Sequence, residues 1–108
     1  MAKKVLGQSN PSATTLTTLY TVPSAKEAVV SSISVANLTA TAATFRIAIR
    51  PAGASITNAH YFGYDITVGA SDTTIITVGI TLAATDVISV YASTANLVFQ
   101  AFGDEASV

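Results

Sequence analysis

The stretch "FRIAIRPAG", residues 45–53, decides the fold class, because apolar and cationic residues alternate in it with a period of two. Successive side chains of an extended chain point to opposite sides, so this pattern separates two faces. The faces consist of Phe45, Ile47 and Ile49 on one side and of Arg46, Ala48 and Arg50 on the other. We therefore predict a strand over residues 43–50 that ends at Pro51, where a missing N–H is tolerated.

Strand patterns continue along most of the 108 residues, separated by turn-forming residues, and no segment shows a convincing helical period. The predicted strands cover 16–22, 28–38, 43–50, 60–68, 73–82, 86–93 and 96–102, and a short strand at 3–6 is left open. Seven or eight short strands without helical crossovers predict an all-β fold, a single antiparallel β-sandwich or jelly roll. We expect a flexible lead-in at 1–15, the sandwich at 16–103 and a tail at 104–108.

The composition combines 50% hydrophobic residues with only 10% charged ones, whereas an ordinary domain has about 25% charged residues. Several predicted outer faces are also weakly polar, since Ile75, Val87 and Tyr91 fall on them. A surface this poor in charge favours permanent association over a free monomer. The net charge of −1 gives no basic footprint for a nucleic acid or for an anionic membrane, so we expect neither partner.

The chain has no cysteine, so disulfides and thiolate metal sites are ruled out. No run of about 20 apolar residues predicts a membrane-spanning helix, and the N-terminus lacks the apolar core of a signal peptide. We therefore expect the protein in the cytoplasm of a bacterium or of a virus-infected cell.

Candidate reactive residues are few. His60 is the only histidine, with Ser55 and Asp65 near it in sequence, but no G-x-S-x-G motif supports a hydrolase. We interpret His60 as a strand-edge or interface residue and keep the enzymatic reading as a minor alternative. The remaining acidic residues are isolated or terminal, and the glycines form no phosphate-binding loop. We predict no enzyme, no metal site and no cofactor; Asp104 and Glu105 are interpreted as solvated tail charges.

Three segments carry a resemblance to a known family, and together they cover most of residues 16–103. They are "LYTVPSAKEAVVSSISVANLTATAATFRIAIRPAGA" (19–54), "GITLAATDVISVYAS" (79–93) and "LVFQAFG" (97–103). They resemble the small β-sandwich structural proteins of tailed bacteriophages. The sequence departs from that pattern at "ATD" (84–86), where relatives often have a glycine in place of Thr85. The shared motifs describe a fold and carry no catalytic or ligand-binding residues.

The resemblance implies a virion component, assembled in the host bacterial cytoplasm. We expect a head decoration or cement protein that bridges subunits of the major capsid protein and forms a homo-oligomer, with a trimer favoured over a dimer. The alternative is a tail, neck, baseplate or fibre component with a glycan-contacting surface. The interface candidates are Arg46, Arg50, Tyr61, Tyr64 and Tyr91. Replacing both arginines by alanine is expected to preserve the fold and to weaken attachment.

Overall fold

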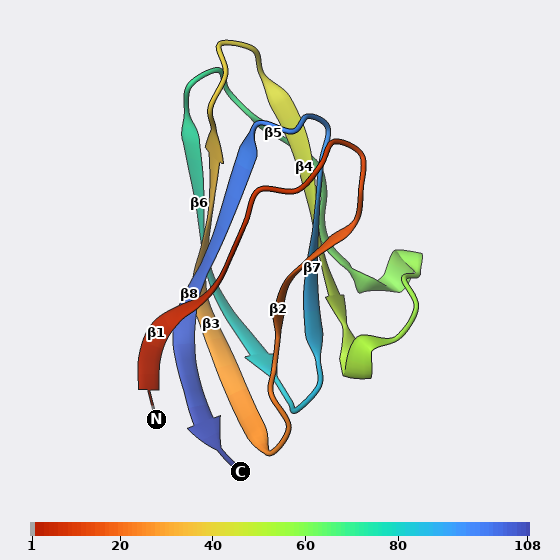
Figure 1. The fold of residues 1–108 in the computed structure, drawn as a ribbon, viewed down its shortest axis with the longest axis vertical. Coiled ribbons are helices and arrows are strands. Elements are labelled where there is room, and N and C mark those ends of the chain that lie inside the picture. Colours follow the sequence, from red (N-terminus) through yellow and green to blue (C-terminus); the bar gives the residue numbers. More distant parts are fainter. Residues whose placement is uncertain (1) are drawn as a thin grey trace.

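The computed structural model describes residues 2–108 and shows two four-stranded antiparallel sheets packed face to face (Figure 1). The predicted all-β sandwich is thereby confirmed. The first sheet has the order β1-β8-β3-β6, with β1 (Ala2–Ser9), β8 (Leu97–Ser107), β3 (Lys26–Asn37) and β6 (Thr73–Leu82). The second sheet has the order β2-β7-β4-β5, with β2 (Thr17–Thr21), β7 (Val87–Ala92), β4 (Ala43–Arg50) and β5 (Tyr61–Val68).

The core lies between the inner faces of the two sheets. Phe45 and Ile47 of β4 are fully buried, as the alternation in residues 45–53 predicted. The ring of Phe45 meets Phe99 of β8 edge to face, with 5.9 Å between the ring centroids. This pair joins the two sheets, and aromatic pairs in this geometry add to the free energy gained from burial.

Both ends of the chain are more ordered than the sequence predicted. The expected flexible lead-in at 1–15 contains β1, which pairs with β8 from Ala2 to Ser9. The expected tail at 104–108 belongs largely to β8, which continues to Ser107 and pairs there with Lys26 of β3. The two chain termini consequently lie at the same end of the sandwich (Figure 1).

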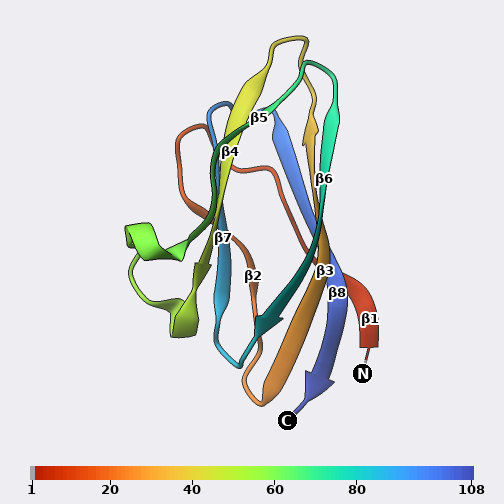
Figure 2. The same ribbon diagram turned by 180° about the vertical axis from the view of Figure 1, so that it is seen from behind.

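The connection between β4 and β5 protrudes from the side of the second sheet (Figure 2). It contains two short 3-10 turns, η1 (Pro51–Gly53) and η2 (Asn58–His60). The turn between β6 and β7 supports η1, because the Asp86 carboxylate accepts hydrogen bonds from the N–H groups of Ala52 and Ala83. Thr85 in this turn has a φ of 69°, a left-handed conformation that glycine adopts more readily.

Candidate functional site

The outer face of the second sheet carries a cluster centred on Arg46 of β4. The guanidinium carbon lies 4.0 Å from the ring centroid of Tyr64 and 4.3 Å from that of Tyr91. Arg46 Nε also donates to Asp65 Oδ1 at 2.6 Å. Tyr61 meets Tyr64 edge to face, with 4.9 Å between centroids. We call Arg46, Tyr61, Tyr64, Asp65 and Tyr91 the Arg46 cluster.

The register of the sheet explains how these side chains meet. Tyr91 of β7 lies directly opposite Arg46 across the β4–β7 ladder. On the other side, Phe45 pairs with Ile66 and Ile47 pairs with Gly63, so Tyr64 and Asp65 both stand opposite Arg46. This is a β-bulge, in which an extra residue redirects side chains on the bulged strand. The φ of 51° at Asp65 belongs to this bulge.

The Arg46 cluster is held together by these contacts and is partly open to solvent: the Arg46 side chain is 21% exposed. Arginine stays charged in proteins, and the hydrogen bond to Asp65 raises the pKa of Arg46 further. Tyr64 is 56% exposed, and the Asp65 side chain is 48% exposed. A guanidinium held between two rings and a carboxylate loses little conformational freedom when a partner binds, which lowers the entropic cost of association. The cluster can therefore act as a rigid contact surface.

Arg50, the second interface candidate on β4, lies in a different environment. Its Nε donates to the carbonyl oxygen of Ala54 at 2.7 Å, and Nη2 donates to that of Gly53 at 3.0 Å. Nη1 donates to the hydroxyl of Ser89 on β7 at 3.2 Å. The planar guanidinium thus fastens the turn η1 to the second sheet, a task that needs several donors at fixed angles. Arg50 supports the surface beside the Arg46 cluster.

His60 and its sequence neighbours do not form a reactive group among residues 2–108. His60 Nδ1 accepts a hydrogen bond from the backbone N–H of Thr57 at 3.2 Å. The Asp65 carboxylate is engaged by Arg46, and no hydrogen bond in the described part of the chain joins His60 to Ser55 or Asp65. Residues 2–108 also contain no group of three or more His, Asp or Glu side chains that could hold a metal ion.

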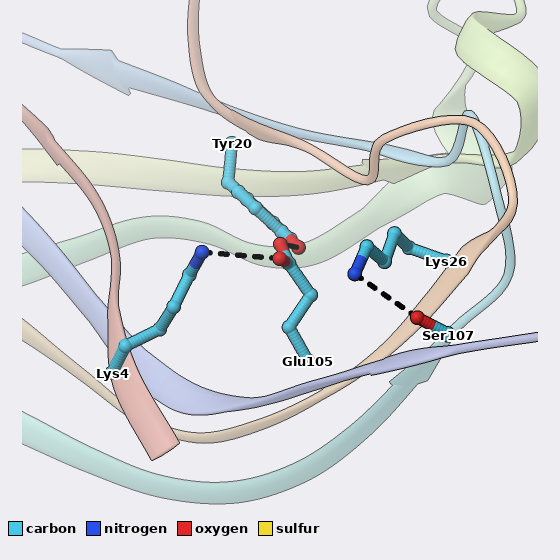
Figure 3. Close-up of polar contacts among 5 residues, drawn as sticks. All are labelled: Lys4, Tyr20, Lys26, Glu105 and Ser107. Carbon is cyan, nitrogen blue, oxygen red and sulfur yellow. Dashed lines mark hydrogen bonds and ion pairs between the residues drawn. The ribbon is translucent and has the colours of Figure 1, made fainter. Parts of the chain in front are cut away.

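A polar network that the sequence analysis missed closes one end of the sandwich (Figure 3). Glu105 of β8 accepts a hydrogen bond from the Tyr20 hydroxyl of β2 at 2.6 Å and from Lys4 Nζ of β1 at 3.0 Å. The bond from Tyr20, followed by that from Lys4, lowers the pKa of Glu105. Burial, followed by Glu105, raises the pKa of Tyr20 above its usual value. Glu105 therefore links three strands and both sheets.

A signal for this network was present in the sequence. The inner face of β8 runs through Phe99, Ala101 and Gly103, which are all buried, and the same period of two places Glu105 next on that face. The predicted strand at 96–102 therefore ends too early, and the interpretation of Asp104 and Glu105 as solvated tail charges is wrong.

A shallow depression lies on the outer face of the first sheet, beside Lys3, Phe102 and Asp104. In the described part of the chain, one carboxylate oxygen of Asp104 is buried there without a hydrogen-bond partner, and no cluster of reactive side chains accompanies it. Among residues 2–108 there is also no helix long and apolar enough to cross a bilayer.

No family model, no curated protein and no solved structure matches this chain. The case for a function therefore depends on the surfaces described above and on the motifs in the sequence.

Proposed function

We propose that the protein is a non-enzymatic structural component of a tailed-bacteriophage virion, specifically a head decoration or cement protein that bridges subunits of the major capsid protein. The observation that carries this proposal is the Arg46 cluster, an exposed and rigid group of aromatic and arginine side chains on a sheet with little other charge. The resemblance of residues 16–103 to phage β-sandwich proteins is the reason for proposing a tailed-bacteriophage virion.

The composition of the Arg46 cluster suits a protein interface. Tyrosine and arginine are enriched among the residues that contribute most to binding free energy at protein interfaces. Tyr64 and Phe62 add exposed aromatic surface on the same strand, at 56% and 48% exposure. Copies bound at many equivalent positions on a capsid would each add their binding free energy to the cohesion of the shell. Moderate affinity at each contact is then sufficient.

A second candidate, a tail or fibre component that contacts a glycan, is favoured by one feature of the same cluster. The exposed ring of Tyr64 lies next to the exposed carboxylate of Asp65. An aromatic ring can stack on a sugar, and a carboxylate can accept hydrogen bonds from its hydroxyl groups. Binding of the purified protein on a glycan array, together with labelling of tails, would favour this candidate over a head protein.

The test of the capsid role is electron microscopy of assembled particles that lack the native protein and are then incubated with the purified chain. We expect density on the head, with the outer face of the second sheet against the capsid. Arg46→Ala should reduce occupancy while the circular dichroism spectrum stays that of a β protein. Lys26→Ala is the matched control, since it removes the same charge from another part of the surface and should leave occupancy unchanged.

Wild-type protein that never associates with particles, or equal occupancy for Arg46→Ala and Lys26→Ala, would contradict the proposal. Arg46→Lys separates charge from geometry, because lysine keeps the charge but loses the planar fork that stacks between two rings. We expect Arg46→Lys to lose part of the occupancy that Arg46→Ala loses, because the charge remains but the stacking geometry does not.

A further inference from the structure

The four edge strands of the sandwich differ in how they are protected. The first sheet ends in β1 and β6, and the second ends in β2 and β5. An edge strand exposes unpaired backbone N–H and C=O groups, and proteins usually guard such edges with charges, prolines, bulges or short strands. β1 carries Lys3 and Lys4, and β5 carries Asp65 in its bulge. β2 is short, with five residues. It is also covered by β1, because the carbonyl group of Leu19 in β2 lies against Gly7 of β1.

β6, the teal strand at the edge of the first sheet in Figure 2, has a register shift but no charged residue or proline to guard its edge. It has ten residues, TTIITVGITL, without any charged residue or proline. In the described part of the chain it pairs only with β3. A register shift occurs where Val78 and Gly79 stand opposite Ser31, but exposed and half-buried positions still alternate without a break up to Thr81. Its outer row of side chains is therefore continuous.

Two positions in this outer row fit each other. The Ile75 side chain is 69% exposed, so it lacks the favourable free energy that burial gives a large apolar side chain. A Cβ atom at Gly79 would meet nothing within 4 Å, so packing within the chain does not require a glycine there. Glycine inside a strand marks a bulge or the close approach of another backbone; the register shift of β6 falls at Gly79, and the open space beside it leaves room for a second strand. The protruding side chain and the gap lie at equal distances on either side of Thr77.

We propose that β6 pairs in antiparallel fashion with β6 of a second copy of this chain, about a two-fold axis at Thr77. In this register Ile75 of each copy lies opposite Gly79 of the other, so each protruding side chain covers the gap on its neighbour. The two first sheets, four strands each, become one continuous sheet. The inference does not depend on the virion role, and a two-fold contact gives a dimer in place of the trimer expected from the sequence.

The inner face of β6 and its lack of charge also support self-pairing. Ile76, Val78 and Ile80 are packed against the core but only partly buried, and a neighbouring strand would cover them further. No ionised side chain in β6 has to lose its hydration when the strands meet. A strand that is uncharged and self-complementary in shape fits a second copy of itself better than it fits a charged partner.

The register can be tested by single cysteines, because the chain has none of its own. Cα atoms of directly opposed residues in antiparallel strands lie roughly 4.5 to 5.5 Å apart, within the range that a disulfide spans. Thr77→Cys should therefore form an intermolecular disulfide under mild oxidation of the full chain. Thr73→Cys is the matched control: its two copies would be separated by roughly 26 Å along the strands. Equal cross-linking of both variants would overturn the proposed register.

The contact itself is tested by the mass of the protein in solution, measured by light scattering over a range of concentrations. The wild-type chain should reach twice its 11.0 kDa. Ile75→Lys and Gly79→Val should each weaken the dimer at least about tenfold. Gly79→Val is informative because valine suits a strand and finds open space within its own chain, so only the second copy opposes it.

Val5→Lys serves as the control for the added charge, since Val5 is an exposed apolar residue on the opposite edge strand of the same sheet. This variant should remain a dimer. A monomeric or trimeric wild-type chain, or the same loss of mass for Val5→Lys and Ile75→Lys, would overturn the inference. Capsid attachment is measured separately with Arg46→Ala. Failure of the dimer proposal can therefore be told apart from failure of the capsid proposal.

Discussion

Arg46 and Arg50 are the same residue type on the same face of β4, yet their surroundings give them different tasks. Arg46 meets two aromatic rings and one carboxylate on an open surface. The Arg50 guanidinium donates hydrogen bonds to two backbone carbonyls and a serine hydroxyl. Exposed ion pairs contribute little to stability, whereas a guanidinium that holds a turn affects the shape of the surface nearby. Arg50 therefore supports the turn η1, whereas Arg46 is the residue that we propose for contact with a partner.

Glu105 should make stability depend on pH in the acidic range. Its folded-state pKa is lowered from 4.5 by the hydrogen bond from Tyr20 and then by Lys4. A lowered pKa means that the carboxylate stabilises the fold above its unfolded pKa, and that this contribution disappears as the pH falls through the folded value. We expect Glu105→Gln to be less stable than wild type at neutral pH, with a difference that shrinks below about pH 4.5.

Urea unfolding of both proteins from neutral to acidic pH measures this difference directly. Tyr20→Phe removes only one of the two partners and should show a smaller pH-dependent part than Glu105→Gln. Curves for wild type and Glu105→Gln that stay parallel across the acidic range would show that the network in Figure 3 does not stabilise the carboxylate.

Among the elements, β4 was predictable and β5 was only partly so. The bounds of β4 match the prediction, and its faces follow a period of two up to Ile47. Beyond that point Ala48 of the predicted outer face is fully buried and Ile49 of the predicted inner face is only partly buried.

The bulge in β5 was not foreseen, because the left-handed residue is Asp65 itself and its conformation depends on pairing with β4. The position of Tyr64 and Asp65 beside Arg46 depends on that bulge. The arginine and the three tyrosines were therefore predicted singly, whereas Asp65 and the contacts that join the cluster were not predicted.

The ends of the sandwich show a different limit. Residues 103–107 of β8 have low strand propensity, and Gly103 followed by two acidic residues is typical of a chain end. Pairing with β1 and β3 holds this segment in the sheet. The extended conformation of residues 103–107 therefore depends on contacts between distant parts of the chain, which the local sequence does not indicate.

Gly103 should be needed for the pairing of β8 with β3. A Cβ atom at this position would overlap the carbonyl oxygen of Val29 and press on the Cα of Val30. Both obstacles are backbone atoms of β3, so they cannot move without disturbing the ladder. We expect Gly103→Ala to lower the free energy of unfolding by about 3 kcal/mol, at the upper end of overpacking costs, measured by urea denaturation.

Gly63→Ala of β5 is the control for this prediction. The added Cβ would meet only the Cδ1 end of the Ile66 side chain, which can rotate away. The expected loss is below about 1 kcal/mol, that of a tolerated core change. Similar losses for the two variants would mean that backbone contact between β3 and β8 is looser than the structure shows.

In the whole molecule, the two proposed interaction surfaces lie on different sheets. The β6 edge belongs to the first sheet, and the Arg46 cluster covers the outer face of the second. One surface is uncharged and offers backbone groups, whereas the other presents a fixed guanidinium with exposed rings. A dimer formed through β6 would therefore carry two copies of the Arg46 cluster, and two linked contacts bind a multivalent surface more tightly than either contact alone.

The different chemistry of the two surfaces predicts opposite responses to salt. Added salt shortens the distance over which exposed charges attract each other, to about 8 to 10 Å at physiological ionic strength, so attachment through Arg46 should weaken as sodium chloride rises. Pairing through β6 involves no charge in its ten residues and should stay constant, or strengthen in sulfate, which favours burial of apolar surface. Light scattering for the dimer and particle occupancy for attachment measure the two separately. A dimer that dissociates in sodium chloride would show that charged groups outside β6 hold the copies together.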